Sequence, residues 1–166
     1  MPRHSVSEAH QDKLRNKHKQ RTVVLFCQEG THSPLQFAQD MGKTLGCPVF
    51  EMHRFDTGQL HDLYNVILIT DGLQHNPTKD STELFNYLHR ERPDLKHINY
   101  SVFSTGNHNR IGSNVLAKRF DEKFSRCGAR KQFCTFGDSQ QGDLGQQYEE
   151  FRERIAASLK EGREVE

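Results

Sequence analysis

The sequence predicts a three-layer α/β sandwich with a five-stranded parallel sheet of order 2-1-3-4-5. Five short apolar segments alternate along the chain with segments whose apolar residues recur at helical spacing. Such alternation requires right-handed crossovers and a parallel sheet covered by helices on both faces. The order 2-1-3-4-5 is one of the two common arrangements of doubly wound sheets, and 166 residues are enough for one domain of this kind.

The five predicted strands are short runs of apolar and β-branched residues. Residues 23–27 read Val-Val-Leu-Phe-Cys, a continuous run that suits a strand buried on both faces. Residues 66–69, Val-Ile-Leu-Ile, form the strongest strand pattern in the chain. The remaining strands are predicted at residues 48–53, 98–103 and 132–136.

The first predicted helix begins at Ser33, because Ser is a good N-cap and Pro34 suits the first helical position. Gly46 can end this helix. Later segments are a short helix or turn at 56–64, a helix at 82–92, a helix from 115 closed by Gly128, and a final helix including 148–159. The residues expected to face the core are Ala38, Met41, Leu45, Leu60, Leu63, Leu84, Phe85, Leu88, Val115, Leu116, Phe120, Phe124, Tyr148, Phe151, Ile155 and Leu159.

Both ends of the chain are polar and charged. A flexible basic arm is predicted for residues 1–21, the folded domain for residues 22–160 and a charged tail for residues 161–166. The arm is expected to be solvated, and contact with an acidic partner or a membrane surface is the alternative.

The overall composition excludes several classes of protein. The 23 basic and 22 acidic residues nearly balance, which gives no argument for specific nucleic-acid binding. Arg126, Arg130 and Lys131 form a basic cluster, for which a solvated helix face is favoured over a nucleic-acid contact. The four cysteines form no CxxC pair, so neither a zinc site nor a redox dithiol is expected. No apolar run suits a transmembrane helix, and the expected location is the cytoplasm.

A ligand site is expected at the carboxyl ends of the strands, where the strand order reverses. Three predicted loops meet there, at residues 28–33, 70–81 and 104–113. The first loop leads into a helix N-terminus, whose free N–H groups and dipole favour an anion, and Gly30 permits close approach to it. The alternative is an ordinary turn between a strand and a helix.

Four segments, taken in order, resemble motifs of flavodoxin-like domains, in particular the FMN-binding domain of diflavin reductases. Residues 24–31 resemble the first strand and phosphate loop, and residues 66–72 resemble the third strand with its T-[YF]-G loop. Residues 100–107, Tyr-Ser-Val-Phe-Ser-Thr-Gly-Asn, resemble the Y-x-V-F-G-x-G-N motif. Residues 142–144, Gly-Asp-Leu, resemble the motif before the closing helix, and the resemblance extends over residues 22–159.

The resemblance implies a fold, a cofactor and a set of binding residues. Flavodoxin-like domains hold the FMN phosphate in the first loop and stack the flavin ring between the second and third loops. No metal and no catalytic residue follow from the resemblance. The residues that would bind FMN are Gln28, Gly30, Thr31, His32, Ser33, Thr70, Gly72, Thr105, Gly106 and Asn107.

Several positions depart from the family's pattern. In the phosphate loop, Cys27 and Glu29 replace hydroxyl residues, and a carboxylate there opposes a phosphate. Asp71 and Arg110 stand where the family has ring-stacking aromatic residues. Residues 139–141, Ser-Gln-Gln, replace a run of acids that face redox partners in the family.

These departures give two interpretations of function. The first is a flavodoxin-like domain without tight FMN binding, which serves as an interaction or scaffold module for a protein partner. The second is an FMN-binding electron-transfer domain that works with an external reductase. The sequence favours the first, and with it the absence of a bound cofactor.

Two further arrangements remain as alternatives. His75 and His108 lie in predicted loops on the ligand side, but their spacing matches no zinc pattern, so scattered surface histidines are favoured over a metal site. Cys27 at the end of the first strand has His32 nearby, which allows a Cys–His nucleophile. A small buried Cys27 is the favoured interpretation.

Overall fold

Five parallel strands form one sheet in the order β2-β1-β3-β4-β5, which confirms the predicted topology. The strands are β1 (Thr22–Phe26), β2 (Val49–Glu51), β3 (Asn65–Thr70), β4 (Asn99–Ser104) and β5 (Arg130–Thr135). All residues of β1, β3 and β4 are buried, as expected for parallel strands covered on both faces. The computed structural model describes residues 21–27, 33–72, 81–106, 114–136 and 143–160.

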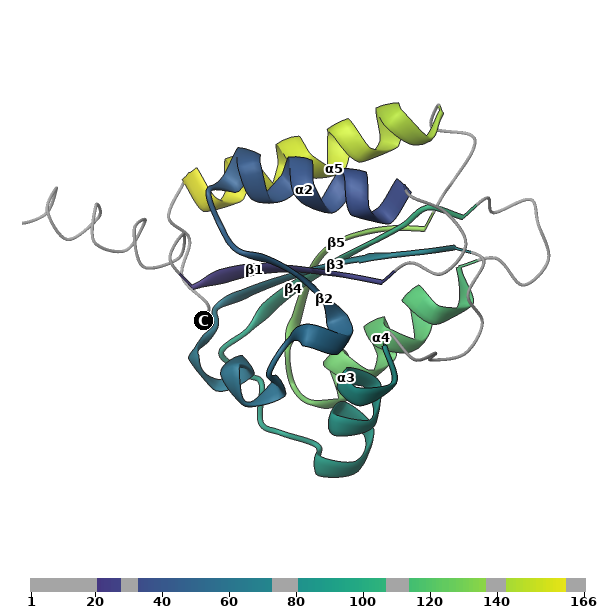
Figure 1. Cartoon of the computed structure of the whole chain (residues 1–166). Coiled ribbons are helices and arrows are strands. Elements are labelled where there is room, and N and C mark those ends of the chain that lie inside the picture. The colour runs from purple at the N-terminus through teal and green to yellow at the C-terminus, as the bar shows by residue number, and fades with distance from the viewer. Residues whose placement is uncertain (1–20, 28–32, 73–80, 107–113, 137–142, 161–166) are drawn as a thin grey trace, which may run out of the picture.

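Helices cover both faces of the sheet and make the three layers visible in Figure 1. Two long helices, α2 (Ser33–Leu45) and α5 (Leu144–Lys160), lie side by side on one face. The other face carries α3 (Thr82–Asn86) and α4 (Val115–Arg126). Short helical turns complete the connections: η1 (Met52–Arg54), η2 (Thr57–Asp62) and η3 (Tyr87–Glu91).

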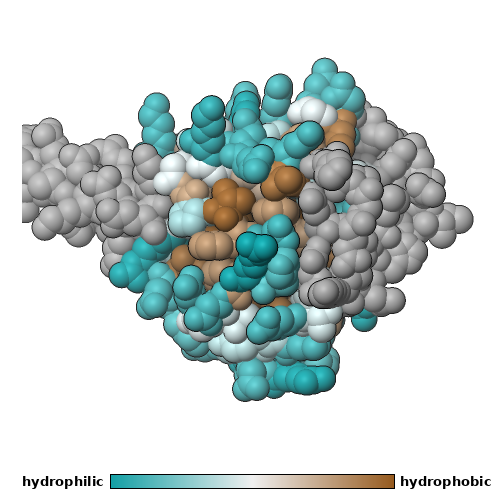
Figure 2. All heavy atoms as spheres, in the orientation of Figure 1, coloured by the Kyte–Doolittle hydropathy of each residue, from teal (hydrophilic) through white to brown (hydrophobic). Residues whose placement is uncertain are grey.

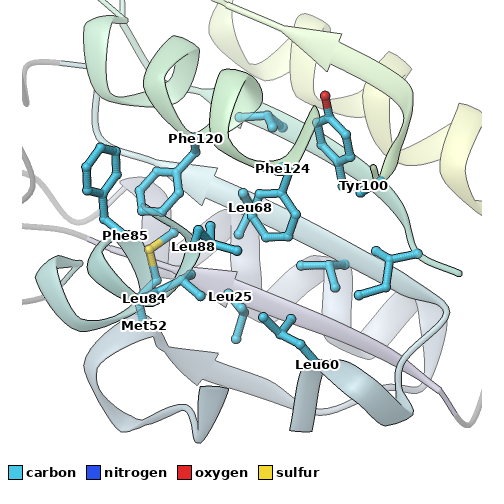
Figure 3. Packing of buried hydrophobic residues seen from close by; sticks show 14 of the residues in the cluster. Leu25, Met52, Leu60, Leu68, Leu84, Phe85, Leu88, Tyr100, Phe120 and Phe124 are labelled. Carbon is cyan, nitrogen blue, oxygen red and sulfur yellow. The ribbon is translucent and has the colours of Figure 1, made fainter. Parts of the chain in front are cut away.

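The sheet separates two apolar cores, because neighbouring residues of a strand point to opposite faces. Leu25 and Leu68 point toward the α3 and α4 side, where they join Tyr100, Phe120 and Phe124 (Figure 3). The Tyr100 and Phe124 rings stack with their centroids 5.3 Å apart. The core on the α2 and α5 side contains Val24, Ile67, Ala38, Met41, Phe103, Tyr148, Phe151 and Ile155. Of the residues predicted to face the core, Leu63, Val115 and Leu159 are only partly buried.

Several predicted element bounds differ from the structure. The second strand ends at Glu51 rather than residue 53, because the chain turns into η1 and buries Met52. The predicted helix at 82–92 is α3 followed by the π-helical turn η3, which ends at Glu91, since Pro93 disfavours helical backbone at Arg92. Arg92 has a φ of 44°. The fifth strand begins two residues earlier than predicted, where Arg130 N donates to Ile98 O at 2.9 Å.

Candidate functional site at the carboxyl ends of the strands

The segments that follow β3 and β4 meet directly at the predicted ligand edge of the sheet. Gly72 N donates to Thr105 Oγ1 at 3.2 Å, and Thr105 N donates to Thr70 O at 3.1 Å. A Cβ on Gly72 would lie 2.0 Å from both N and Cα of Gly106. The two backbones therefore touch, and this approach requires glycine. Four of the predicted site residues, Thr70, Gly72, Thr105 and Gly106, are brought together here.

Asn114 joins three strand ends at this edge. Its Oδ1 accepts from Ser104 Oγ at 2.5 Å, its Nδ2 donates to Phe136 O at 2.5 Å, and its backbone N donates to Gly72 O at 2.8 Å. Asn114 is 2% exposed and has a φ of 66°, a left-handed conformation that Asn tolerates better than most residues. Asn114 thus fixes the positions of the segments after β3 and β5 relative to β4.

Sequence reasoning did not find Asn114. Its three partners lie between 10 and 42 positions away, so no local spacing indicates them. The available signal was weak: Asn immediately before the predicted fourth helix is compatible with an N-cap. The structure gives it a different role, because its side chain makes no cap hydrogen bond.

Thr70 ends β3 on the ligand side and Asp71 follows it, and both residues are buried. Thr70 is fully buried, and its Oγ1 makes no hydrogen bond with any residue that the structure describes. Buried hydroxyl groups are normally bonded, so Thr70 Oγ1 is an exception among the residues that the structure describes. Asp71 is 1% exposed and therefore presents no side chain to solvent at the predicted ring-stacking position.

Asp143 has a structural role in the part of the resemblance that precedes α5. Gln146 N donates to Asp143 Oδ1 at 2.8 Å, and Asp143 N donates to Gln146 Oε1 at 3.1 Å. These reciprocal bonds form a capping box, which satisfies two N–H groups at the start of α5. Asp143 and Leu144 therefore begin a helix in this structure.

The remaining predicted site residues are placed as follows. Ser33 is the first residue of α2, which confirms the predicted start of the helix. Cys27 is 2% exposed, and its backbone N donates to Ile69 O at 3.2 Å, in agreement with a small buried residue after β1. Residues outside the described part of the chain are Gln28, Glu29, Gly30, Thr31, His32, His75, Asn107, His108, Arg110, Ser139, Gln140, Gln141 and Gly142.

The described residues include neither a metal cluster nor a membrane-spanning helix. No group of three or more His, Cys, Asp or Glu side chains in these segments could hold a metal ion. None of the helices formed by these residues has the length and apolar character needed to cross a membrane.

The fold is similar to that of solved flavodoxins. A flavodoxin from Streptococcus pneumoniae is 21% identical with a TM-score of 0.62, and the match covers 82% of this chain and 97% of that one. Oxidised flavodoxin 2 from Bacillus cereus is 14% identical with a TM-score of 0.63, and the match covers 83% of this chain and 99% of that one. A short-chain flavodoxin associated with a non-canonical PDU bacterial microcompartment is 16% identical with a TM-score of 0.62. The match covers 84% of this chain and 98% of that one.

These similarities establish the fold class. The chain has a flavodoxin-like α/β fold. Because the identities lie between 14% and 21%, the similarity is one of architecture. No family model matches the sequence, and no curated protein matches it.

Proposed function

We propose that this protein is a flavodoxin-like module that contacts a protein partner and does not hold FMN tightly. Asp71 is the observation that carries the proposal. Its carboxylate is buried where the family resemblance puts an aromatic ring, and a carboxylate has no π face to stack on a flavin. Asp71 therefore does not fit an FMN ring stacked at this position.

Two residues of the sequence support the same conclusion. Glu29 lies in the predicted phosphate loop, and two like charges about 4 Å apart repel by roughly 4 kcal/mol at an effective dielectric constant of about 20. Arg110 replaces the second predicted aromatic wall, although a guanidinium can stack on a ring. The phosphate and both faces of the ring would thus lose their usual contacts.

The visible spectrum of the purified protein is the first test, followed by calorimetric titration of the apo form with FMN. We expect a colourless protein and a dissociation constant above about 10 μM, which is weaker than about −7 kcal/mol. A solved flavodoxin from Bacillus cereus, titrated in the same buffer, is the positive control. A yellow protein with one FMN per chain would overturn the proposal.

Asp71 variants test whether this position causes the weak binding. Asp71→Tyr should strengthen FMN binding about fivefold, since an aromatic pair contributes roughly 0.5–1.5 kcal/mol beyond its buried area. Asp71→Asn has the same size without the charge and without a ring, so it separates charge from stacking. Circular dichroism of both variants establishes that they are folded.

An FMN-binding electron-transfer domain that works with an external reductase is the second candidate. The close approach of Gly72 to Gly106 favours it, because this contact keeps the backbone of a ligand edge in place. The Thr70 hydroxyl at the same edge has no hydrogen-bond partner among the described residues. FMN bound there would supply one- and two-electron transfer. Reduction of added FMN on the protein, with potentials shifted from those of free FMN, would support this candidate.

A further inference from the structure

A groove lies on the opposite side of β1 from the site at Gly72, between α2 and the edge strand β2. Its volume is about 310 Å³, and Phe26, Leu35, Val49 and Phe50 supply the apolar part of its lining. Phe50 borders the groove and is 36% exposed, and its ring centroid lies 6.2 Å from that of Phe55 in the core on the α3 and α4 side. In Figure 2, hydrophobic surface appears between α2 and β2 with hydrophilic surface around it.

The groove borders a free strand edge. Among the described strands, β2 pairs only with β1, and Pro48 O accepts from Val24 N at 3.0 Å. Since successive residues of a strand direct their backbone groups to opposite sides, Phe50 also faces β1. The backbone groups of Val49 and the N–H of Glu51 then face outward, where an added strand can bond to them.

The positive charge of Arg54 at one end of the groove favours extended peptides that carry an acidic residue. Glu51 also lines the groove, and its Oε2 is 3.2 Å from His53 Nδ1, a contact that is an ion pair when the imidazole is protonated. Arg54 also lines the groove, is exposed and forms no ion pair with a residue that the structure describes. An apolar groove that ends at an exposed arginine is complementary to an apolar side chain followed by an acidic one.

We infer that the groove and the edge of β2 bind an extended segment of a protein partner by strand addition. One apolar side chain of that segment enters the groove, and an acidic side chain two positions later, on the same face of the added strand, pairs with Arg54. The backbone of Val49 and the N–H of Glu51 bond to the segment. This inference rests on the proposed function as an interaction module and assigns its contact surface.

Nuclear magnetic resonance of the full chain, labelled with nitrogen-15, tests the inference. The probe is the capped peptide Thr-Val-Thr-Leu-Thr-Glu-Thr-Lys, added up to about 5 mM, because millimolar contacts remain visible at that concentration. The amide signals of Val49 and Glu51 should shift, and the exchange of their protons with solvent should slow. A peptide with Lys in place of Glu should bind about tenfold more weakly.

Arg54→Glu should reverse this preference, so that the Lys peptide binds about tenfold more tightly than the Glu peptide. The new carboxylate repels the Glu peptide and attracts the Lys peptide. Lys118→Glu is the matched control, because Lys118 is exposed on α4 and does not line the groove. Its preference should remain that of the original chain. Both changes are at exposed positions and should leave the fold intact.

Three results would overturn the inference. The first is no change at Val49 and Glu51 with either peptide, and the second is an Arg54→Glu variant that keeps the original preference. The third is protection of the same amides by dilution-sensitive dimers without peptide, which assigns the edge to a second copy. Stoichiometric FMN uptake would instead refute the proposed function and leave the peptide result unaffected, so the two failures are distinguishable.

Discussion

Gly72 and Gly106 hold the segments after β3 and β4 in backbone contact. A Cβ on Gly72 would lie 2.0 Å from two backbone atoms of Gly106, and backbone cannot move aside as a flexible side chain can. Gly72→Ala should therefore destabilise the protein by about 1–3 kcal/mol, the usual effect of overpacking. Urea denaturation measures the change in the free energy of unfolding.

Gly145→Ala is the control for that substitution. A Cβ on Gly145 would make ordinary contact with Asp143 Oδ1 at 3.4 Å, and the residue lies in the first turn of α5. Alanine there should stabilise the protein by up to about 1 kcal/mol through higher helix propensity. Equal effects of the two substitutions would refute the importance of the Gly72 contact.

The stabilities of Asn114 variants should depend on both the hydrogen bonds of Asn114 and its φ of 66°. Asn114→Gly loses the bonds to Ser104 and Phe136 but keeps the left-handed backbone without strain. Asn114→Ala loses the same bonds and adds strain of roughly 1–2 kcal/mol. The original protein should be the most stable, then the Gly variant, then the Ala variant. Thermal denaturation checks the order, and an Ala variant more stable than the Gly variant would contradict it.

The sequence was sufficient for the topology because the signals that determine it are local. Alternating strand and helix patterns predict the parallel sheet, and Gly46 and Gly128 end α2 and α4 with φ values of 66° and 91°. The roles of Asn114 and of the Thr70 hydroxyl depend on residues brought together only by the sheet. No periodicity contains that information. The family resemblance located the edge of the sheet at which these residues lie, but not how they bond.

Tyr100 connects β4 to α4 through a buried hydroxyl. Its Oη donates to Asp121 Oδ1 at 2.6 Å, and Lys131 Nζ lies 2.9 Å from Asp121 Oδ2. Tyr100→Phe should destabilise the protein by about 1.5–3 kcal/mol, the range for a hydrogen bond to a charged group. Tyr87→Phe is the control, because the Tyr87 hydroxyl has a longer, exposed contact of 3.3 Å with His61 and its loss should have little effect.

The bond between Tyr100 and Asp121 predicts that the free energy of unfolding changes at alkaline pH. Burial and then the bond to Asp121 raise the pKa of Tyr100 well above its usual value of 10.0. A raised pKa in the folded state contributes stability that is present below about pH 10 and is lost as pH rises further. The stability difference between the original chain and Tyr100→Phe should therefore shrink above about pH 10. A difference that grows there would contradict the assignment.

Asp40 joins α2 to α5, and its contacts predict that the free energy of unfolding changes at acidic pH. Its Oδ2 accepts from Tyr148 Oη at 2.7 Å and from Arg152 at 2.8 Å. Burial raises the pKa of Asp40, but the bonds from Tyr148 and Arg152 outweigh it, so the pKa lies below the usual 3.8. A lowered pKa contributes stability that is present above about pH 4 and is lost as pH falls below that value.

Asp40→Asn should therefore be less stable than the original chain at pH 7, and the two stabilities should converge below about pH 4. Chemical denaturation at several pH values measures the difference. Glu153→Gln is the control, since Glu153 is exposed on α5, and its stability curve should run parallel to that of the original chain. A constant difference for Asp40→Asn across the acidic range would refute the pKa assignment.

The four free thiols should react slowly in the folded protein. Burial raises the pKa of Cys47 and of Cys134 to about 11, and both Cys27 and Cys127 are buried. A rise from 9.0 to about 11 reduces the thiolate fraction at pH 8 by about 100-fold, and the alkylation rate with it. Iodoacetamide labelling with peptide mass analysis measures each rate, and unfolding in guanidinium should make all four react rapidly. Rapid labelling of Cys27 alone in the folded state would contradict this and would favour a nucleophile activated by His32 over a small buried residue.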